Sequence, residues 1–314
     1  MTVSTYDLAM RIPFRGQQRR QGMLISGPSG WGEFSPFPEY DATESARWLA
    51  AALEAANDGW PSPRRSRVAV NTTVPAIAPQ QAHDLVAASG CATAKVKVAE
   101  PGQSLTDDLA RVEAVRDALG STGRVRVDAN AGWTLDEATK ALRELSAFDL
   151  EYAEQPVASL EDMAALRRRV DVRLAADESI RKADDPERVA VRSAADIVVL
   201  KVQPLGGVRA CLRIAERCGL PVVVSSAIET SIGIAAGLAL AGALDDLPYA
   251  CGLATVPLLD GDVCSASLVP DRGSLPVLAR APEPDLLGGA LAPIEVERHW
   301  QQRRRDAQEV LGGR

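Results

Sequence analysis

The chain has 314 residues, of which 46% are hydrophobic and 25% are charged, and its formal net charge is −7. That length suffices for a barrel with a smaller unit attached, and the composition is typical of a globular protein. The acidic balance argues against nucleic acid and against an anionic membrane as partners, because both require a basic face.

The N-terminal segment and the cysteines indicate where the protein works. MTVSTYDLAMRIPF contains Asp7 and Arg11, which interrupt the apolar core that an export signal needs. The apolar stretch 230–244 is too short to span a membrane. The five cysteines are odd in number and include no CxxC pair, so we expect buried thiols in a reducing cytoplasm.

The first part of the chain predicts a small unit of strands followed by a helix. Segments 8–14 and 22–36 are β-like runs broken by Gly and Pro, and the polar run RGQQRRQ at 15–21 predicts a loop between them. Residues 42–57 have helical spacing, and GWPSPRRSR at 59–67 predicts a linker into the next unit.

From Val68 onward the pattern becomes an alternation of short apolar runs and helical stretches. This alternation indicates a parallel sheet with helices outside it. The expected strands are 68–73, 94–98, 125–128, 150–154, 173–177, 197–201, 222–225 and 249–252. After Gly252 the chain returns to loops and β-like runs, and it ends in an expected helix, 294–311, that we expect to pack back against the first unit.

Acidic and basic side chains follow these strands at a nearly constant interval. Asp128, Glu154, Asp177 and Lys201 are separated by 26, 23 and 24 residues, about the length of one strand, one helix and two short loops. Only a ring brings so many strand ends near one point, so we favour a closed barrel over an open doubly wound sheet. Catalytic groups of such barrels gather on that rim.

The three acids predict a metal site. Asp128, Glu154 and Asp177 supply hard oxygen ligands, and no histidine or cysteine pair accompanies them. This donor set suits Mg²⁺, with Mn²⁺ as the alternative. Any one of these acids could instead cap the helix after its strand, but three at one repeat favour a metal. His83 and His299 fall in expected helices, so histidine-based catalysis is not predicted.

Lys95 and Lys97 are two residues apart in an expected strand, so both side chains point to one face. Repulsion between two ammonium groups near a metal should lower the pKa of at least one of them, which makes it a usable general base. Lys201 would lie roughly across the barrel from them, an arrangement that suits removal of a proton alpha to a carboxylate. The alternative, a solvent-facing pair on an edge strand, is disfavoured by the apolar flanking residues.

Taken together, these residues resemble the enolase superfamily, in particular its muconate-lactonizing subgroup, over nearly the whole chain. The resemblance implies a (β/α)₇β TIM-type barrel at 67–270, and an α+β capping domain formed by 1–66 and completed by about 271–314. The superfamily's pattern of KxK, DxN, E, D and K on barrel strands two to six is matched by Lys95 and Lys97, Asp128 and Asn130, Glu154, Asp177 and Lys201.

The resemblance also implies a reaction. RVDANAGW, EQP, ADES, VLKVQPLGG and SSAIETSIG look most like segments of the subgroup's Mg²⁺-dependent dehydratases of menaquinone biosynthesis. In that case Lys97 removes the alpha proton of 2-succinyl-6-hydroxy-2,4-cyclohexadiene-1-carboxylate, and loss of hydroxide, protonated by the same lysine, makes the ring aromatic. Lys201 would stabilise the enediolate, Lys95 would tune Lys97, and Asn130 would support the metal ligands.

Further substrate contacts are expected at the rim. Ser225 and Ser226 end the seventh strand and would bind the succinyl carboxylate, and Gly252 on the eighth would leave room for it. Arg126 points to the same side of its strand as the metal ligand two residues on, and the 15–21 loop would close over the substrate with Phe14, Arg15 and Gly16 nearest the rim. For each of these residues, a packing or solvation role is an equal alternative.

The motifs leave other functions open. A racemase or epimerase of N-acylamino acids or dipeptides needs the same metal and both lysines, but a dipeptide epimerase generally needs an acidic group near strand eight, and YACGLAT offers none. Lactonization of muconates is a third reaction. A barrel that binds a metal and a small acid without turnover is disfavoured, because all the core groups are intact. We expect a small carboxylate as the partner and a monomer or small homo-oligomer.

Overall fold

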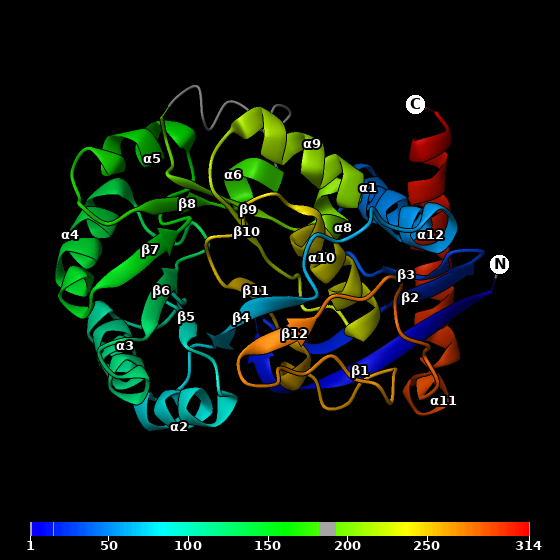
Figure 1. Ribbon diagram of the computed structural model, residues 1–314, viewed down its shortest axis with the longest axis horizontal. Coiled ribbons are helices and arrows are strands. Elements are labelled where there is room, and N and C mark those ends of the chain that lie inside the picture. The colour runs from blue at the N-terminus through cyan, green and yellow to red at the C-terminus, as the bar shows by residue number, and fades with distance from the viewer. Residues whose placement is uncertain (1, 15, 182–192, 314) are drawn as a thin grey trace.

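Two sheets organise the computed structural model, which describes residues 2–14, 16–181 and 193–313. A three-stranded antiparallel sheet near both chain termini lies beside a larger barrel of parallel strands (Figure 1). Within these ranges, no helix combines the length and the apolar character that crossing a membrane requires.

The N-terminal sheet includes a stretch that we expected to be a loop. It consists of β1 (Val3–Phe14), β2 (Gln17–Gly27) and β3 (Gly30–Phe34) in that order. The loop expected at 15–21 is wrong, because residues 17–21 belong to β2 and pair mainly with β1. Their polar side chains suit a half-buried strand: Arg19 is exposed and pairs with Asp7 at 2.7 Å, whereas Arg20 points inward and is buried.

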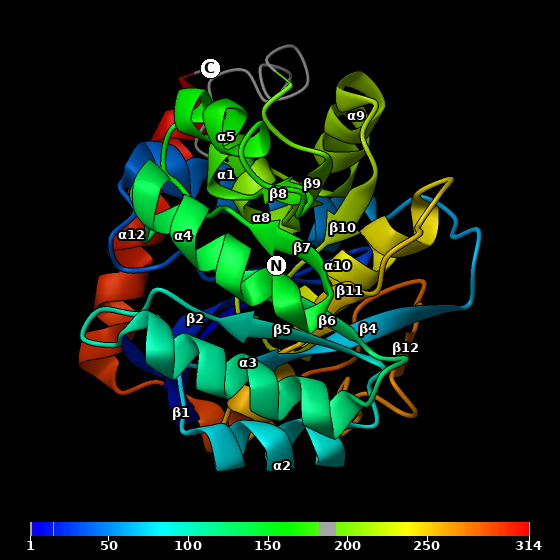
Figure 2. The ribbon, with the colours of Figure 1, turned by 90° about the vertical axis from the view of Figure 1, so that its left-hand side faces the viewer.

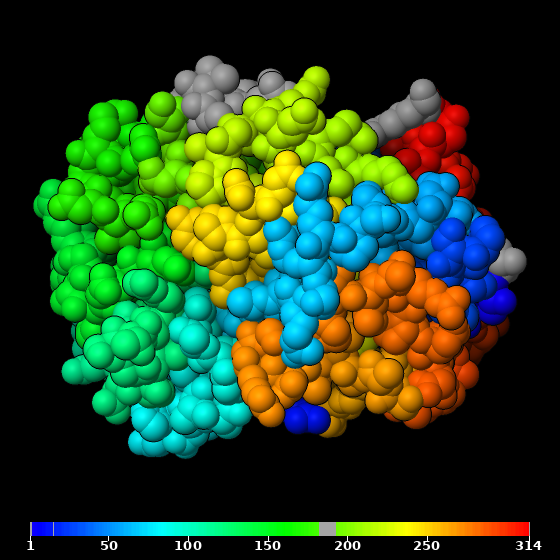
Figure 3. All heavy atoms as spheres, viewed as in Figure 1, coloured from blue at the N-terminus to red at the C-terminus, as the bar shows by residue number. Residues whose placement is uncertain are grey.

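Two helices cover this sheet. α1 (Ala42–Leu53) begins at Asp41, whose side chain accepts a hydrogen bond from the Glu44 backbone, and a wider turn, Glu54–Asp58, follows it. α12 (Ile294–Gly312) packs on α1 from the other end of the chain. Figure 3 shows the orange and red C-terminal residues against the blue N-terminal ones. The Trp300 ring lies 5.8 Å from that of Phe34.

Gly32 allows β3 to lie directly on α1. A Cβ atom added at Gly32 would lie 2.0 Å from the backbone oxygen of Ala52. We expect Gly32→Ala to lower the free energy of unfolding by about 3 kcal/mol, because neither backbone can move away without disturbing the sheet. Urea denaturation would measure this loss. The control is Gly288→Ala, where nothing lies within 4 Å of the added atom, and an equal loss in both variants would contradict the argument.

The barrel strands follow the predicted alternation. They are β4 (Arg67–Val74), β5 (Thr93–Lys97), β6 (Arg124–Asp128), β7 (Leu150–Glu154), β8 (Leu174–Ala176), β9 (Ile197–Leu200), β10 (Val222–Val224) and β11 (Cys251–Ala254). They pair in the order β10-β9-β8-β7-β6-β5-β4-β11, and a parallel bridge between Ser225 and Gly252 closes the ring. The predicted TIM-type barrel with an α+β unit is therefore confirmed.

Helices surround the barrel, as Figure 2 shows for α3 and α4. The helices between strands are α2 (Pro79–Ser89), α3 (Leu105–Leu119), α4 (Leu135–Leu145), α5 (Leu160–Arg167), α6 (Glu178–Arg181), α8 (Val202–Leu205), α9 (Val208–Cys218) and α10 (Ser231–Ala243). After the barrel, β12 (Ser274–Pro276) pairs antiparallel with β4, and α11 (Leu287–Ala290) precedes α12. α4 begins with a capping box formed by Thr134 and Glu137, and all five cysteines are buried thiols. The domain limits drawn from the sequence stay a prediction.

Candidate active site

The charged side chains that end the middle strands meet inside one end of the barrel. Lys95 and Lys97 lie on β5, Asp128 and Glu154 end β6 and β7, and Asp177 and Lys201 directly follow β8 and β9. The register places Lys97 beside Asp128 and Asp128 beside Glu154. Each of the six residues is at most 7% exposed, so their charges must balance one another.

Each acid pairs with a lysine. Lys95 Nζ donates to Glu154 Oε2 at 2.9 Å, and Lys97 Nζ donates to Asp128 Oδ2 at 2.6 Å. Lys201 Nζ donates to Asp177. The spacing of the sequence predicted that these groups share one rim, and the structure brings all of them together. It also shows that β5 and β9, which carry the amines, are separated by β6, β7 and β8 and so face each other across the ring.

The two lysines of β5 differ in their acidity. Burial lowers the pKa of Lys97, and together with repulsion from Lys95 it outweighs the attraction of Asp128. Burial also acts on Lys95, but attraction to Glu154 and Asp128 raises its pKa above the ordinary value. Of these two amines, Lys97 is therefore the one better suited to act as a base.

Two amides position the acids. The Asn130 backbone donates to Asp128 Oδ1 at 3.0 Å, and the Asn130 side chain donates to Glu178 and accepts from Lys97. Gln155 was missed by the sequence reasoning, although it lies in the EQP motif. Its Oε1 accepts from the backbone of Asp177 at 3.0 Å, which fixes the turn that presents the carboxylate.

The opposite wall of the cavity is made of small polar and apolar residues. Ser225, Ser226 and Gly252, which we expected to contact the substrate, line it, and the cavity also touches Ile228. A Cβ at Gly252 would lie 2.6 Å from the Ser225 hydroxyl, so a side chain there would displace that group. The cavity lining is completed by Phe14, Phe37, Thr73, Ala227 and Thr255. Phe14 and Phe37 come from the N-terminal unit.

One predicted substrate residue, Arg126, does not line this cavity. Arg126 is fully buried in the barrel interior, where it donates to Glu151, to Asn71 and to the Ala250 carbonyl. Its guanidinium lies 4.7 Å from the Tyr152 ring. Arg126 therefore fills the barrel below the cavity. Arg15 lies outside the described residues.

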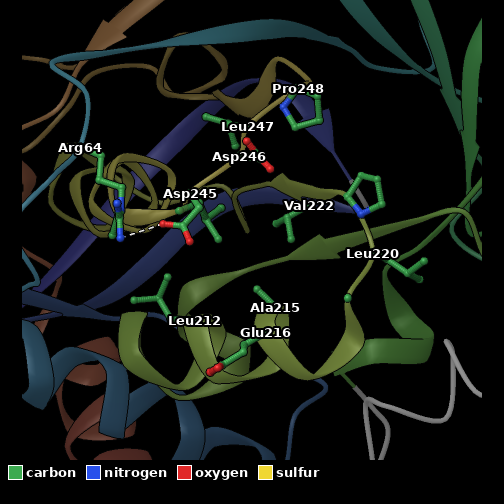
Figure 4. A pocket seen from close by; sticks show the side chains of 14 residues that line it. Arg64, Leu212, Ala215, Glu216, Leu220, Val222, Asp245, Asp246, Leu247 and Pro248 are labelled. Carbon is green, nitrogen blue, oxygen red and sulfur yellow. Dashed lines mark ion pairs between the residues drawn. The ribbon is translucent and has the colours of Figure 1, made fainter.

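A larger hollow lies at the other end of the barrel. It measures about 1020 Å³ and lies between α9 and α10, beside the beginning of β10 at Val222 (Figure 4). Arg64 and Asp245 form an exposed ion pair of 2.8 Å on its side. None of the described residues that line it is one of the strand-end acids or lysines, so it is not the candidate active site.

The three acids are suited to a divalent metal by their chemistry. Among the described residues, no three acidic, histidine or cysteine side chains are gathered as metal ligands. Each of the three acids pairs with a lysine. Burial and repulsion from Asp128 nevertheless raise the pKa of Glu154 to about 7, and Asp177 contributes to this repulsion. A divalent cation bound by oxygen ligands would relieve it.

Comparisons with known proteins identify the family and the fold of the chain. Residues 78–284 match the family described as "Enolase C-terminal domain-like", and residues 5–56 match "Enolase N-terminal domain-like". Solved structures of the same fold include the L-Ala-D/L-Glu epimerase of Bacillus subtilis, at 23% identity and a TM-score of 0.78 over 90% of this chain and 96% of that one. The muconate lactonizing enzyme of Pseudomonas fluorescens has 22% identity and a TM-score of 0.74 over 95% and 97%.

Two relatives with higher sequence identity share one name. A protein of Thermobifida fusca named o-succinylbenzoate synthase is 59% identical over 96% of this chain and 95% of its own length. A protein of Mycolicibacterium smegmatis with the same name is 52% identical over 93% and 90%. The chain therefore belongs to the o-succinylbenzoate synthase family of the enolase superfamily.

Proposed function

We propose that Lys97, Lys201 and the three strand-end acids carry out the dehydration that the family performs in menaquinone biosynthesis. The enzyme converts 2-succinyl-6-hydroxy-2,4-cyclohexadiene-1-carboxylate to o-succinylbenzoate. The observation that supports this assignment is the placement of two buried amines on facing strands, with three acids between them and a cavity beside them.

Lys97 is the base in this proposal. Its neutral amine takes the proton from the carbon alpha to the ring carboxylate, and the electron pair moves into that carboxylate to give an enediolate. The ammonium of Lys201, on the facing strand end, stabilises the added negative charge. When the enediolate collapses, the bond between the ring carbon and its hydroxyl breaks. Lys97 returns its proton to the departing oxygen, so water leaves and the ring is aromatic.

Membership of the enolase superfamily implies that the enzyme uses a divalent metal ion. We propose that this ion is Mg²⁺, with Mn²⁺ as the alternative, and that Asp128, Glu154 and Asp177 hold it. When bound, it would supply positive charge beside the substrate carboxylate, which makes the proton on the adjacent carbon more acidic. Lys95, which contacts Glu154 and Asp128, would share these acids with the ion and would keep the pKa of Lys97 below its own, and Asn130 would orient Asp128.

The serine wall is proposed to bind the distal part of the substrate. Ser225 and Ser226 would donate to the succinyl carboxylate, and Gly252 would leave the space it occupies. The partner is thus a small carboxylate acted on by a monomer or small homo-oligomer. The five buried thiols are consistent with the proposed location in a reducing cytoplasm.

Metal removal tests the proposal directly. We expect the purified protein with Mg²⁺ to form o-succinylbenzoate, followed by its ultraviolet absorbance, and excess chelator to stop turnover until Mg²⁺ is restored. Zn²⁺ or Ca²⁺ in place of Mg²⁺ serves as the control for nonspecific ion effects. A turnover rate that excess chelator does not change would contradict the metal assignment. With no turnover under any condition, deuterium exchange at the alpha carbon of N-acylamino acids becomes the decisive measurement.

A further inference from the structure

A buried arginine of the N-terminal sheet reaches the wall of the candidate active site. Arg20 on β2 is 2% exposed. Its Nε donates to the Ile228 carbonyl at 2.8 Å, and its Nη2 donates to the Ala227 carbonyl at 3.1 Å. Both of these residues line the cavity, next to Ser225 and Ser226. One side chain of the N-terminal unit therefore holds the backbone of the barrel's substrate wall.

The backbone that Arg20 holds is strained. Ile228 has a φ of 62°, in the left-handed region that β-branched residues rarely adopt. Such a conformation persists only where surrounding contacts over-determine it. Besides Arg20, the Glu229 carboxylate secures the turn by accepting from the Ala227 backbone at 2.6 Å. Without these contacts, the carbonyls of the turn would lose their buried donors, and the wall would relax.

A second buried side chain of the same sheet holds the helix that follows this turn. Glu33 on β3 accepts from the backbone of Thr230, the N-cap of α10, at 3.1 Å and from that of Gly233, in the first turn, at 3.0 Å. A carboxylate is favourable there because the first backbone N–H groups of a helix have no partner within it. Ser35 connects the two charges, since its hydroxyl accepts from Arg20 at 2.9 Å and donates to Glu33 at 2.8 Å.

We propose that Arg20 is a positioning residue for substrate binding. By fixing the Ala227 and Ile228 carbonyls against the N-terminal sheet, it sets the shape of the Ser225–Ile228 wall. This inference rests on the proposed function of the site. The wall faces the part of the substrate that does not react, while Lys97 and Asp128 lie on other strands. A displaced wall therefore weakens binding more than it slows chemistry.

The test compares three variants by steady-state kinetics. Arg20→Met removes the donors, and Arg20→Lys keeps the charge but not the forked geometry. We expect the KM for the cyclohexadiene substrate to rise by about tenfold or more in Arg20→Met and by less in Arg20→Lys, with kcat within about threefold of wild type. Arg19→Met is the matched control, because Arg19 is the neighbour on β2 whose side chain is 53% exposed, and its KM should not change.

Hydrogen exchange supplies a readout that does not need activity. Amides of residues 225–234 should exchange about tenfold faster in both Arg20 variants, whereas those of β6 should exchange as in wild type. An inactive wild type would contradict the proposed function but leave this measurement intact. The positioning role is overturned by an unchanged KM, by a fall in kcat alone, by unchanged exchange, or by failure of both variants to fold, which would mark Arg20 as a residue of stability only.

Discussion

Replacing Lys97 by alanine is expected to lower kcat by at least about 10³-fold, because we propose that the same amine serves as base and then as acid. Its position supports both roles: it is buried, its Nζ contacts Asp128 at 2.6 Å, and burial lowers its pKa. The measurement is the initial rate of o-succinylbenzoate formation at saturating substrate and Mg²⁺, so that weaker binding does not lower the observed rate.

The matched control for this change is Lys140→Ala. Lys140 is exposed on α4, so its removal takes away an amine without touching the site, and kcat should stay at the wild-type value. Circular dichroism must show that Lys97→Ala is folded, since Asp128 loses a buried partner, although Lys95 remains 3.4 Å away. A folded Lys97→Ala enzyme with near wild-type kcat would exclude Lys97 as the base and would favour a barrel that uses Lys201 instead.

The strand-end groups were predictable because their spacing along the sequence reflects the regular length of the barrel's repeating unit. In a (β/α) barrel each unit has nearly the same length, so groups at strand ends recur at one interval in the sequence and at one rim in space. Asp128, Glu154 and Lys201 all follow this rule. The sequence could not show which lysine pairs with which acid, because that depends on how the side chains share the barrel interior.

The role of Arg20 was not predictable, because it depends on contacts with residues that are distant in the sequence. In the run RGQQRRQ it resembles the solvated arginines beside it, and such a polar run is typical of a loop. Its carbonyl partners, Ala227 and Ile228, lie 207 and 208 residues away. The position of the Arg126 side chain likewise depends on distant residues. The sequence predicted which face of the strand it lies on. Whether the side chain reaches the rim or fills the barrel interior depends on neighbours such as Asn71 and Tyr152.

Replacing Asp177 by asparagine is expected to weaken Mg²⁺ binding by at least about 100-fold, because outer contacts of a metal site alone cost 10–100-fold and Asp177 is proposed as a direct ligand. Asparagine keeps the shape of the side chain but removes the charge. Asp177 lies beside two cations, Lys201 and Arg181, the latter with its Nε 3.3 Å from Oδ1. Without the carboxylate, the positive charges of these two side chains would not be neutralised and would repel the metal ion.

Isothermal titration of the apo-enzyme with Mg²⁺ would measure this change, with Asp171→Asn as the control. Asp171 is an exposed acid that precedes the same strand, so its variant loses one negative charge without altering the site and should bind Mg²⁺ as the wild type does. If Asp177→Asn titrated like Asp171→Asn, the carboxylate would be only the counterion of Lys201 and Arg181. The metal would then have to be held by Asp128 and Glu154 alone, a set with too few protein ligands to fix the substrate between Lys97 and Lys201.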